Sequence, residues 1–268
     1  NGILVVTESL FSMDSDTPDI AGLQDLAHEF NATLVVDVAH DLGNLGPTGR
    51  GFLEIQNMVG KVDVVMGSFS KTFASNGGFV AARGRAVKEY MRYYSSPNTF
   101  SNALSPASAA IVSKAFEIVC SPEGNALRAK LHRNIMMLRS MLHSCGLETY
   151  GDPSAIICVK TGTESFSRLV SRRLPGLGML ANLVEFPAVP KGQARFRLQM
   201  MANHSQHDII DAVHRLSAAV SEASFDVAAL ESGELAIEDL HALPLAPNAD
   251  ESLAAPVVER QPRRRAAN

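Results

Sequence analysis

The stretch that decides the fold spans residues 32–78 and reads ATLVVDVAHDLGNLGPTGRGFLEIQNMVGKVDVVMGSFSKTFASNGG. It holds two apolar segments, ATLVVD and VDVVMG, and each runs into a loop rich in small and polar residues. Short apolar strands separated by a helix-length segment predict a βαβ unit with a buried parallel sheet. Ligands of such sheets bind outside the carboxyl ends of the strands, so we expect Asp37, His40 and Lys71 to share one rim.

The small and polar residues of these loops form a long, ordered motif. D-x-A-H is followed by G-x-x-G-x-x-G-R-G, a strand, S-F-S-K and a Gly-Gly pair. The motif resembles that of the α-oxoamine synthases, which include glycine C-acetyltransferase, 8-amino-7-oxononanoate synthase, 5-aminolevulinate synthase and serine palmitoyltransferase. The resemblance runs from about Gly2 to Ser221. It implies the type I fold of pyridoxal 5'-phosphate (PLP) enzymes, with PLP as the cofactor.

The order of the predicted elements divides the chain into three parts. Residues 1–125 alternate strands and helices, which predicts an α/β unit with a mostly parallel sheet, the C-terminal portion of the large PLP-binding domain. Residues 126–225 are predicted to form a smaller α+β domain that closes with a helix from Ser205 to about Val220. Residues 226–268 are rich in Pro and Ala and end in RRRAAN, so we expect a disordered tail.

Composition and charge argue against several functional classes. The formal net charge of -4 and the pI of about 6.1 argue against a nucleic-acid or membrane-surface partner. Three widely spaced cysteines predict neither a disulfide framework nor a metal site and favour a cytoplasmic setting. The sequence has no apolar run long enough to predict a membrane-spanning segment. A strand begins directly after Asn1, and the resemblance implies a large preceding part, so we expect the chain to belong to a longer polypeptide.

Three residues of the opening stretch are the catalytic candidates. From the residues alone, Lys71 is most simply a solvated loop lysine, whereas the resemblance implies a Schiff base with PLP. The resemblance also implies that Asp37 pairs with the pyridinium nitrogen of PLP. It implies that His40 hydrogen-bonds the phenolic oxygen of PLP and polarises the incoming acyl carbonyl. A capping Asp and a structural His are the alternatives, and Val38 stands where the family usually has Glu.

Two serines are candidates for phosphate contacts. Ser68, three residues before Lys71, matches the family residue that contacts the cofactor phosphate. Ser101 lies in an F-S-N segment, in which the family serine reaches the phosphate of the partner subunit's cofactor. Helix-entry capping is the alternative for Ser101. If the resemblance holds for Ser101, the protein forms a homodimer with a shared active site.

Substrate contacts are expected from Arg197 and Ser12. Arg197 in VPKGQARFRLQM matches the family arginine that holds the substrate α-carboxylate, which suits a bidentate guanidinium. Arg195 lies on the same face of the predicted strand, so the alternation of side chains does not choose between the two. Ser12 matches a family serine near the substrate, and Ser15 stands where that motif usually has Gly.

The function expected from this resemblance is acyl transfer with decarboxylation. A small amino acid is condensed with an acyl thioester, carried by CoA or by a carrier protein, and CO2 is lost to give an α-amino ketone. Lys71 removes the α-proton, and the VPKGQARFR segment most resembles glycine C-acetyltransferase. Two alternatives stay open. One is a PLP aminotransferase of the same fold, and the other is a truncated, non-catalytic subunit that pairs with an active partner.

Overall fold

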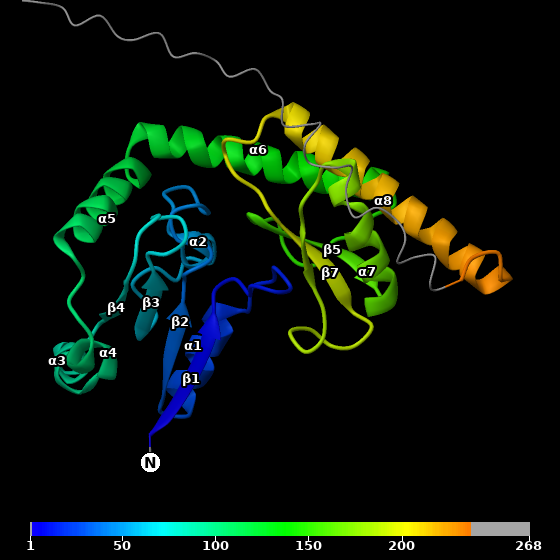
Figure 1. Ribbon diagram of the computed structural model, residues 1–268. Coiled ribbons are helices and arrows are strands. Elements are labelled where there is room, and N and C mark those ends of the chain that lie inside the picture. Colours follow the sequence, from blue (N-terminus) through cyan, green and yellow to red (C-terminus); the bar gives the residue numbers. More distant parts are fainter. Residues whose placement is uncertain (1, 237–268) are drawn as a thin grey trace, which may run out of the picture.

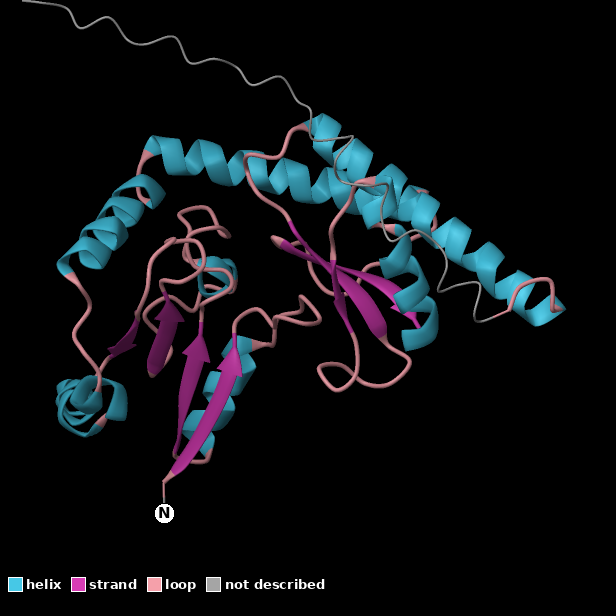
Figure 2. Ribbon diagram, viewed as in Figure 1, coloured by secondary structure: helices cyan, strands magenta, loops and turns pink. Residues whose placement is uncertain are grey.

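The computed structural model describes residues 2–236, which form two adjoining units of sheet and helix (Figure 1). The first unit has a four-stranded sheet of order β1-β2-β3-β4, and the second has a three-stranded sheet of order β5-β7-β6 (Figure 2). The strands are β1 (Ile3–Glu8), β2 (Ala32–Asp37), β3 (Val64–Ser68), β4 (Gly78–Ala82), β5 (Ile156–Gly162), β6 (Asn182–Val184) and β7 (Ala194–Gln199). The helices are α1 (Ile20–Glu29), α2 (Gly51–Ile55), α3 (Arg85–Tyr94), α4 (Ser96–Phe100), α5 (Pro106–Val119), α6 (Pro122–Ser144), α7 (Glu164–Arg173) and α8 (Gln206–Ser232), with a 3-10 turn, η1 (Pro175–Leu177).

The first sheet is mostly parallel, as the βαβ pattern predicts. Strands β1, β2 and β3 run parallel, and β4 alone is antiparallel, paired with β3. Leu34 and Val36 of β2 are fully buried, and Ile20 and Ala27 of α1 pack in the same core cluster. The carboxyl ends of the three parallel strands therefore point to one edge of the unit.

The second unit packs its antiparallel sheet against α6, α7 and α8. Phe196 of β7, Ile135 of α6 and Leu216 of α8 are all fully buried in its core cluster. Figure 1 shows α5 and α6 following one another from the first unit to the second, above the loops at the carboxyl ends of the parallel strands. Ile156 and Cys158 of β5 pack in the core cluster of the first unit, so the two units share buried side chains.

Short polar side chains cap the helix starts. Asp19 caps α1 by accepting a hydrogen bond from the N–H of Gly22. Ser105 caps α5, which has Pro106 in its first turn. Ser205, the predicted start of the last helix, forms a capping box with Asp208 at the start of α8. These caps form because a short polar side chain satisfies an N–H group that the helix itself leaves unpaired.

The predicted end of the last helix is wrong. Helix α8 does not stop at about Val220 but continues to Ser232, so residues 226–232 are helical rather than part of a tail. Asp226 lies 2.6 Å from the guanidinium of Arg173 on α7, and Gly233, with φ 76°, ends the helix. The predicted disorder of residues 237–268 lies outside the described residues. Within the described part of the chain, no helix is long and apolar enough to cross a membrane.

Candidate active site

The carboxyl ends of neighbouring strands bring polar side chains to one edge of the first sheet. Glu8 ends β1, Asp37 ends β2 and Ser68 ends β3, and Glu8 lies opposite Asp37 in the strand register. The Oδ1 atom of Asp37 accepts a hydrogen bond of 2.9 Å from the N–H of Ala39, which fixes the carboxylate just beyond the strand. Burial, followed by the negative charge of Asp37, raises the pKa of the Glu8 carboxyl. Two carboxyl groups therefore meet at this edge.

His40 lies three residues beyond the end of β2 and is half-buried. Burial lowers the pKa of its imidazole to about 4, and the cationic side chains of Lys71 and Arg197 act in the same direction. The carboxylate of Asp37 acts against them with a smaller effect. The imidazole is therefore neutral near pH 7, with one N–H to donate and one nitrogen to accept a hydrogen bond.

The loop that carries Lys71 is anchored by aromatic rings and by a glycine. Phe69 and Phe73 are buried on either side of Lys71 in the sequence, and their ring centroids lie 5.6 Å apart in an edge-to-face arrangement. Gly78 allows the returning backbone to approach closely, because a Cβ atom there would lie 2.5 Å from the carbonyl oxygen of Gly67. The side chain of Lys71 is exposed. The anchored loop therefore presents an accessible amine at the sheet edge.

Ser68 and Ser70 form a local pair of hydroxyl groups before Lys71. The Oγ atom of Ser68 accepts a hydrogen bond of 3.1 Å from the N–H of Ser70, and the two Oγ atoms are 2.7 Å apart. Sequence reasoning assigned no role to Ser70. The structure makes it the partner that orients the hydroxyl of Ser68.

Asn44 joins the loop after β2 to the loop of Lys71, and sequence reasoning missed it. Its Nδ2 atom donates to the carbonyl oxygen of His40 at 2.9 Å and to Oγ1 of Thr72 at 3.0 Å. Gly43, with φ +88°, permits the contact between the loops, because a Cβ atom there would lie 2.8 Å from Cγ2 of Thr72. The available signal was an amide inside a glycine motif, which does not identify a partner in another loop.

Arg195 of β7 is fully buried and has a structural environment. Its guanidinium donates to the carbonyl oxygens of Met13 and Gln193 and forms an ion pair with Asp14. The guanidinium carbon also lies 4.0 Å from the centre of the Tyr150 ring, within the range of a cation–π contact. Arg195 is therefore occupied by protein groups on all sides.

Arg197 is half-buried and only partly occupied. Its Nε atom donates a hydrogen bond of 2.8 Å to the carbonyl oxygen of Ser12. No hydrogen bond from Nη1 or Nη2 reaches another of the described residues 2–236. The two Nη nitrogen atoms of the guanidinium are thus left for a ligand, which distinguishes Arg197 from Arg195 where the sequence pattern did not.

The loop after β1, which contains Ser12, is bound tightly to the second unit. Ser15 has φ 59°, a left-handed conformation that glycine adopts more readily. Its buried hydroxyl donates to the carbonyl oxygen of Ile156 at 2.7 Å and lies 2.8 Å from Oγ of Ser154. A Cβ atom on Gly151 would lie 2.2 Å from the carbonyl oxygen of Asp14, so the two segments are in close backbone contact. These contacts fix the position of Ser12 beside Arg197.

A cavity of about 800 Å³ brings three of the predicted residues together. Lys71, His40 and Arg197 all line it, and Asn44 and Arg128 line it as well. We call it the central cavity. Its lining residues include three cationic side chains and no acidic one, so it suits a ligand with negative charge.

Four predicted residues do not line the central cavity. Asp37 and Ser68 lie at the strand edge, and Ser12 contacts the cavity indirectly through its bond to Arg197. Ser101 follows α4, which lies at the other end of the first sheet from the carboxyl ends of β1, β2 and β3 (Figure 1). A single chain therefore does not bring Ser101 to the cavity, and its contact with a partner's cofactor stays a prediction.

The family profile described as aminotransferase class I and II matches residues 1–216. The chain belongs to this family. Among the relatives of this family member, the 8-amino-7-oxononanoate synthase of Geobacter metallireducens is 36% identical over 215 residues, which cover 80% of this chain and 55% of the relative. The 2-amino-3-ketobutyrate coenzyme A ligase of Escherichia coli (strain K12) is 36% identical over 212 residues, which cover 79% and 52%. The chain spans about half the length of the curated relatives it matches.

Solved structures support the same assignment. The serine palmitoyltransferase of Sphingomonas wittichii matches with a TM-score of 0.78 at 26% identity, covering 84% of this chain and 56% of that one. A serine palmitoyltransferase from S. paucimobilis, solved with bound PLP and myriocin, has a TM-score of 0.77 at 27% identity and covers 83% and 56%. This aminotransferase class I and II family member has the type I fold of the PLP-dependent transferases. The resemblance to the α-oxoamine synthases is confirmed, since 8-amino-7-oxononanoate synthase and serine palmitoyltransferase both belong to that group.

Proposed function

We propose that this family member takes part in PLP-dependent acyl transfer, in which a small amino acid and an acyl thioester condense with loss of CO2 to give an α-amino ketone. The observation that carries the proposal is the central cavity, where an exposed amine of Lys71, a neutral imidazole of His40 and a partly unoccupied guanidinium of Arg197 converge. The relatives are named as a synthase, a coenzyme A ligase and palmitoyltransferases, which fits an acyl group delivered as a CoA thioester.

The residues at the strand edge fit PLP. Asp37 has an oxygen, Oδ2, with no hydrogen bond to the described residues 2–236, and it can accept one from a protonated pyridine nitrogen. The hydroxyl groups of Ser68 and Ser70 offer donors to a phosphate, and Lys71 offers a primary amine. Bound PLP supplies a carbonyl carbon that reacts with amines and a ring that takes up negative charge from the neighbouring carbon.

Lys71, Arg197 and His40 each have a defined task in this proposal. The Nζ atom of Lys71 would hold the cofactor at its aldehyde carbon, and as a free amine it would accept the α-proton of the bound amino acid. Arg197 presents two Nη donors to the α-carboxylate, a geometry that suits a bidentate pair. His40 is neutral because its pKa is about 4, so it donates an N–H to the acyl oxygen as that oxygen becomes negative.

The alternatives differ in what the site must do. An aminotransferase would share Lys71, Asp37 and Arg197 but would need no acyl thioester. A non-catalytic subunit would not need the lysine, and Lys71, Asp37 and His40 are all present at this edge. We also propose that the protein is a homodimer, because Ser101 follows α4 at the other end of the first sheet and does not line its own chain's cavity. The three widely spaced cysteines favour a cytoplasmic setting.

The test compares the spectrum of the protein with added PLP before and after Lys71→Ala. We expect the wild type to show an absorption band at roughly 420 nm that survives dialysis, and we expect Lys71→Ala to lose this band. Lys61→Ala is the matched control, because Lys61 is an exposed lysine in the loop before β3 and should keep the band. Absence of the band in the wild type would contradict the proposal.

The reaction is then tested with carboxyl-labelled amino acids. We expect labelled CO2 to be released when an acyl-CoA is added and not without it. Transfer of the amino group to a keto acid without release of CO2 would instead identify an aminotransferase. Binding of PLP with neither reaction would favour the non-catalytic subunit.

A further inference from the structure

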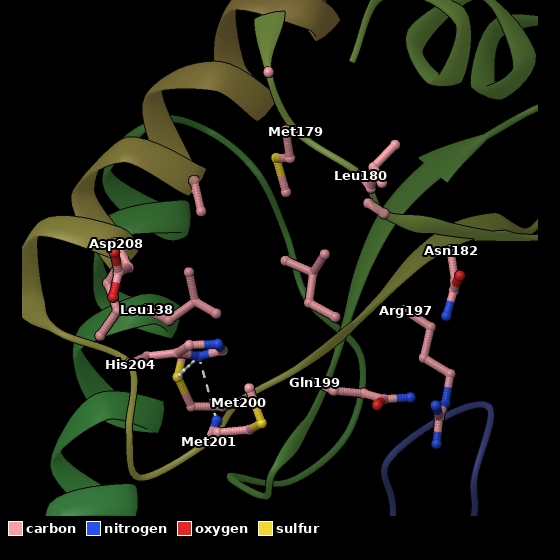
Figure 3. Close-up of a pocket in the computed structure, with 15 residues that line it drawn as sticks. Leu138, Met179, Leu180, Asn182, Arg197, Gln199, Met200, Met201, His204 and Asp208 are labelled. Atoms are coloured by element: carbon pink, nitrogen blue, oxygen red, sulfur yellow. Dashed lines mark hydrogen bonds between the residues drawn. The ribbon is translucent and has the colours of Figure 1, made fainter. Parts of the chain in front are cut away.

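A second cavity of about 730 Å³ adjoins the central cavity (Figure 3). We call it the side cavity. It lies between β7 and the helices α6 and α8, and four residues line both cavities, namely Arg197, Gln199, Met200 and Met201. The two cavities therefore meet along the C-terminal end of β7.

The wall of the side cavity is mainly hydrocarbon. Leu138 comes from α6, Met179 and Leu180 from the segment before β6, and Ile209 and Ala212 from α8. Leu180 is 89% exposed, although burial of such a side chain is favourable. The side cavity therefore offers apolar surface that an apolar ligand would cover.

Polar groups are placed at the end of the side cavity next to the central cavity. Figure 3 shows Asn182, Arg197 and Gln199 together at one end, and Arg197 points toward the loop after β1. At the other end, Asp208 is held in the capping box of α8, where it accepts the N–H of Ser205. A ligand with a polar head and an apolar body thus fits with its head near Arg197.

Met200 and Met201 stand at the boundary between the two cavities, and His204 contacts both residues. The Nδ1 atom of His204 accepts a hydrogen bond of 3.3 Å from the N–H of Met201 and lies 3.3 Å from the sulfur of Met200. Unbranched thioether side chains adapt their shape to an apolar neighbour. The boundary between the two cavities beside Arg197 is therefore lined by apolar side chains that can adapt their shape.

We propose that the side cavity binds the hydrocarbon chain of the acyl thioester, and that the protein prefers medium or long acyl chains. This inference rests on the proposed function. The volume of about 730 Å³ lies within the range of small-molecule sites, and a two-carbon acyl group would leave its apolar wall uncovered. Each methylene that enters an apolar site strengthens binding by up to about fourfold.

The test measures how binding depends on chain length. Non-reactive S-ethyl and S-dodecyl CoA thioethers are titrated by calorimetry into the PLP-loaded protein, and the ratio of the two affinities is taken for each variant. Ala212→Phe fills the side cavity, and Leu180→Asp places a charge at an exposed position of its wall. Ala218→Phe is the matched control, because Ala218 lies on α8 and lines neither cavity.

We expect the wild type to bind the dodecyl thioether at least about 30-fold more tightly than the ethyl thioether, because the burial of a few methylenes is enough to give this ratio. The ratio should fall at least about tenfold in both cavity variants and persist in the control. An equal affinity for both thioethers in the wild type, or an unchanged ratio in both cavity variants, would overturn the inference. The proposed function fails separately, if no acyl-CoA of any length causes release of CO2.

Discussion

The Nε atom of Arg197 donates a hydrogen bond of 2.8 Å to the carbonyl oxygen of Ser12, so β7 of the second unit and the loop after β1 meet at the central cavity. This bond uses one donor of the guanidinium and orients the other two nitrogen atoms. Arg195, two residues earlier on the same strand, donates its hydrogen bonds to protein groups. We therefore expect mutation of Arg197 to affect ligand binding and mutation of Arg195 to affect stability.

Arg197→Lys is expected to weaken binding of the amino acid while the protein stays folded. A lysine keeps the charge but loses the bidentate geometry, so the KM for the amino acid should rise about tenfold or more. Arg195→Met should instead lower the free energy of unfolding by about 2–3 kcal/mol, because it removes a fully buried guanidinium that bonds the carbonyl oxygens of Met13 and Gln193 and pairs with Asp14. Steady-state kinetics and urea unfolding of the two variants decide between these roles. Equal effects on KM and stability in both variants would contradict the distinction.

His40 is expected to titrate far below an ordinary histidine. Its imidazole should show a pKa of about 4 by NMR, and Lys71→Ala should raise that pKa because a neighbouring cation is removed. Burial is the larger cause, so the pKa should stay below 6.5 in the variant. A pKa near 6.5 in the wild type would remove the argument for a neutral imidazole.

The lowered pKa of His40 also fixes the sign of a stability effect. Between about pH 4 and 6.5 the unfolded chain binds the proton of His40 more readily than the folded chain does. The free energy of unfolding is therefore highest above pH 6.5 and decreases as the pH falls toward 4. His40→Gln should flatten this part of the stability profile.

The carboxyl of Asp41 is expected to change stability with pH in the direction opposite to that of His40. This fully buried carboxyl accepts hydrogen bonds from Oγ of Ser9 at 2.8 Å and from the N–H of Phe52 at 2.7 Å, and burial raises its pKa from 3.8 to about 6. The folded state holds the proton more tightly, so stability falls as the pH rises from 4 to 6. Relative to Asp41→Asn, the wild type should lose on the order of 2–3 kcal/mol over this range, measured by urea unfolding at each pH. A constant difference between the two proteins would contradict the raised pKa.

Asn44 and Thr72 are expected to behave as one unit. Asn44→Ala and Thr72→Val each break the bond between the loops of His40 and Lys71, so the double variant should cost less than the sum of the two single variants. We expect a coupling energy of about 0.5–1.5 kcal/mol in unfolding and faster amide hydrogen exchange over residues 69–75 in both single variants. Additive effects would show that the contact does not hold the loop of Lys71.

Local signals in the sequence predicted most of the fold. The strand that ends at Asp37 and the helix that starts at Ser205 depend on residues that are close in the sequence, and the structure confirms them. The longer course of α8 was missed because it depends on a distant contact. Asp226 pairs with Arg173, which lies 53 residues earlier in the chain.

In the candidate site, too, local signals predicted some features, and distant contacts decided the others. The motif placed His40 and Lys71 at one edge, because both follow strands of a parallel sheet. It did not separate Arg195 from Arg197, since the difference lies in the loop that holds Ser12 and Asp14, more than 180 residues away in the chain. Contacts of this kind leave no periodic pattern, so spacing alone does not predict them.

Ser15 offers the sharpest test of how this loop is held. The left-handed φ of Ser15 favours glycine at this position. Ser15→Gly and Ser15→Ala both remove a buried hydroxyl that bonds to Ile156 and Ser154. Ser15→Ala loses the bonds and keeps the strain, so it should lower the free energy of unfolding by about 2 kcal/mol, and Ser15→Gly by about 1 kcal/mol. Urea unfolding ranks the variants, and a glycine variant more stable than the wild type would show that the hydroxyl contributes less than the backbone strain.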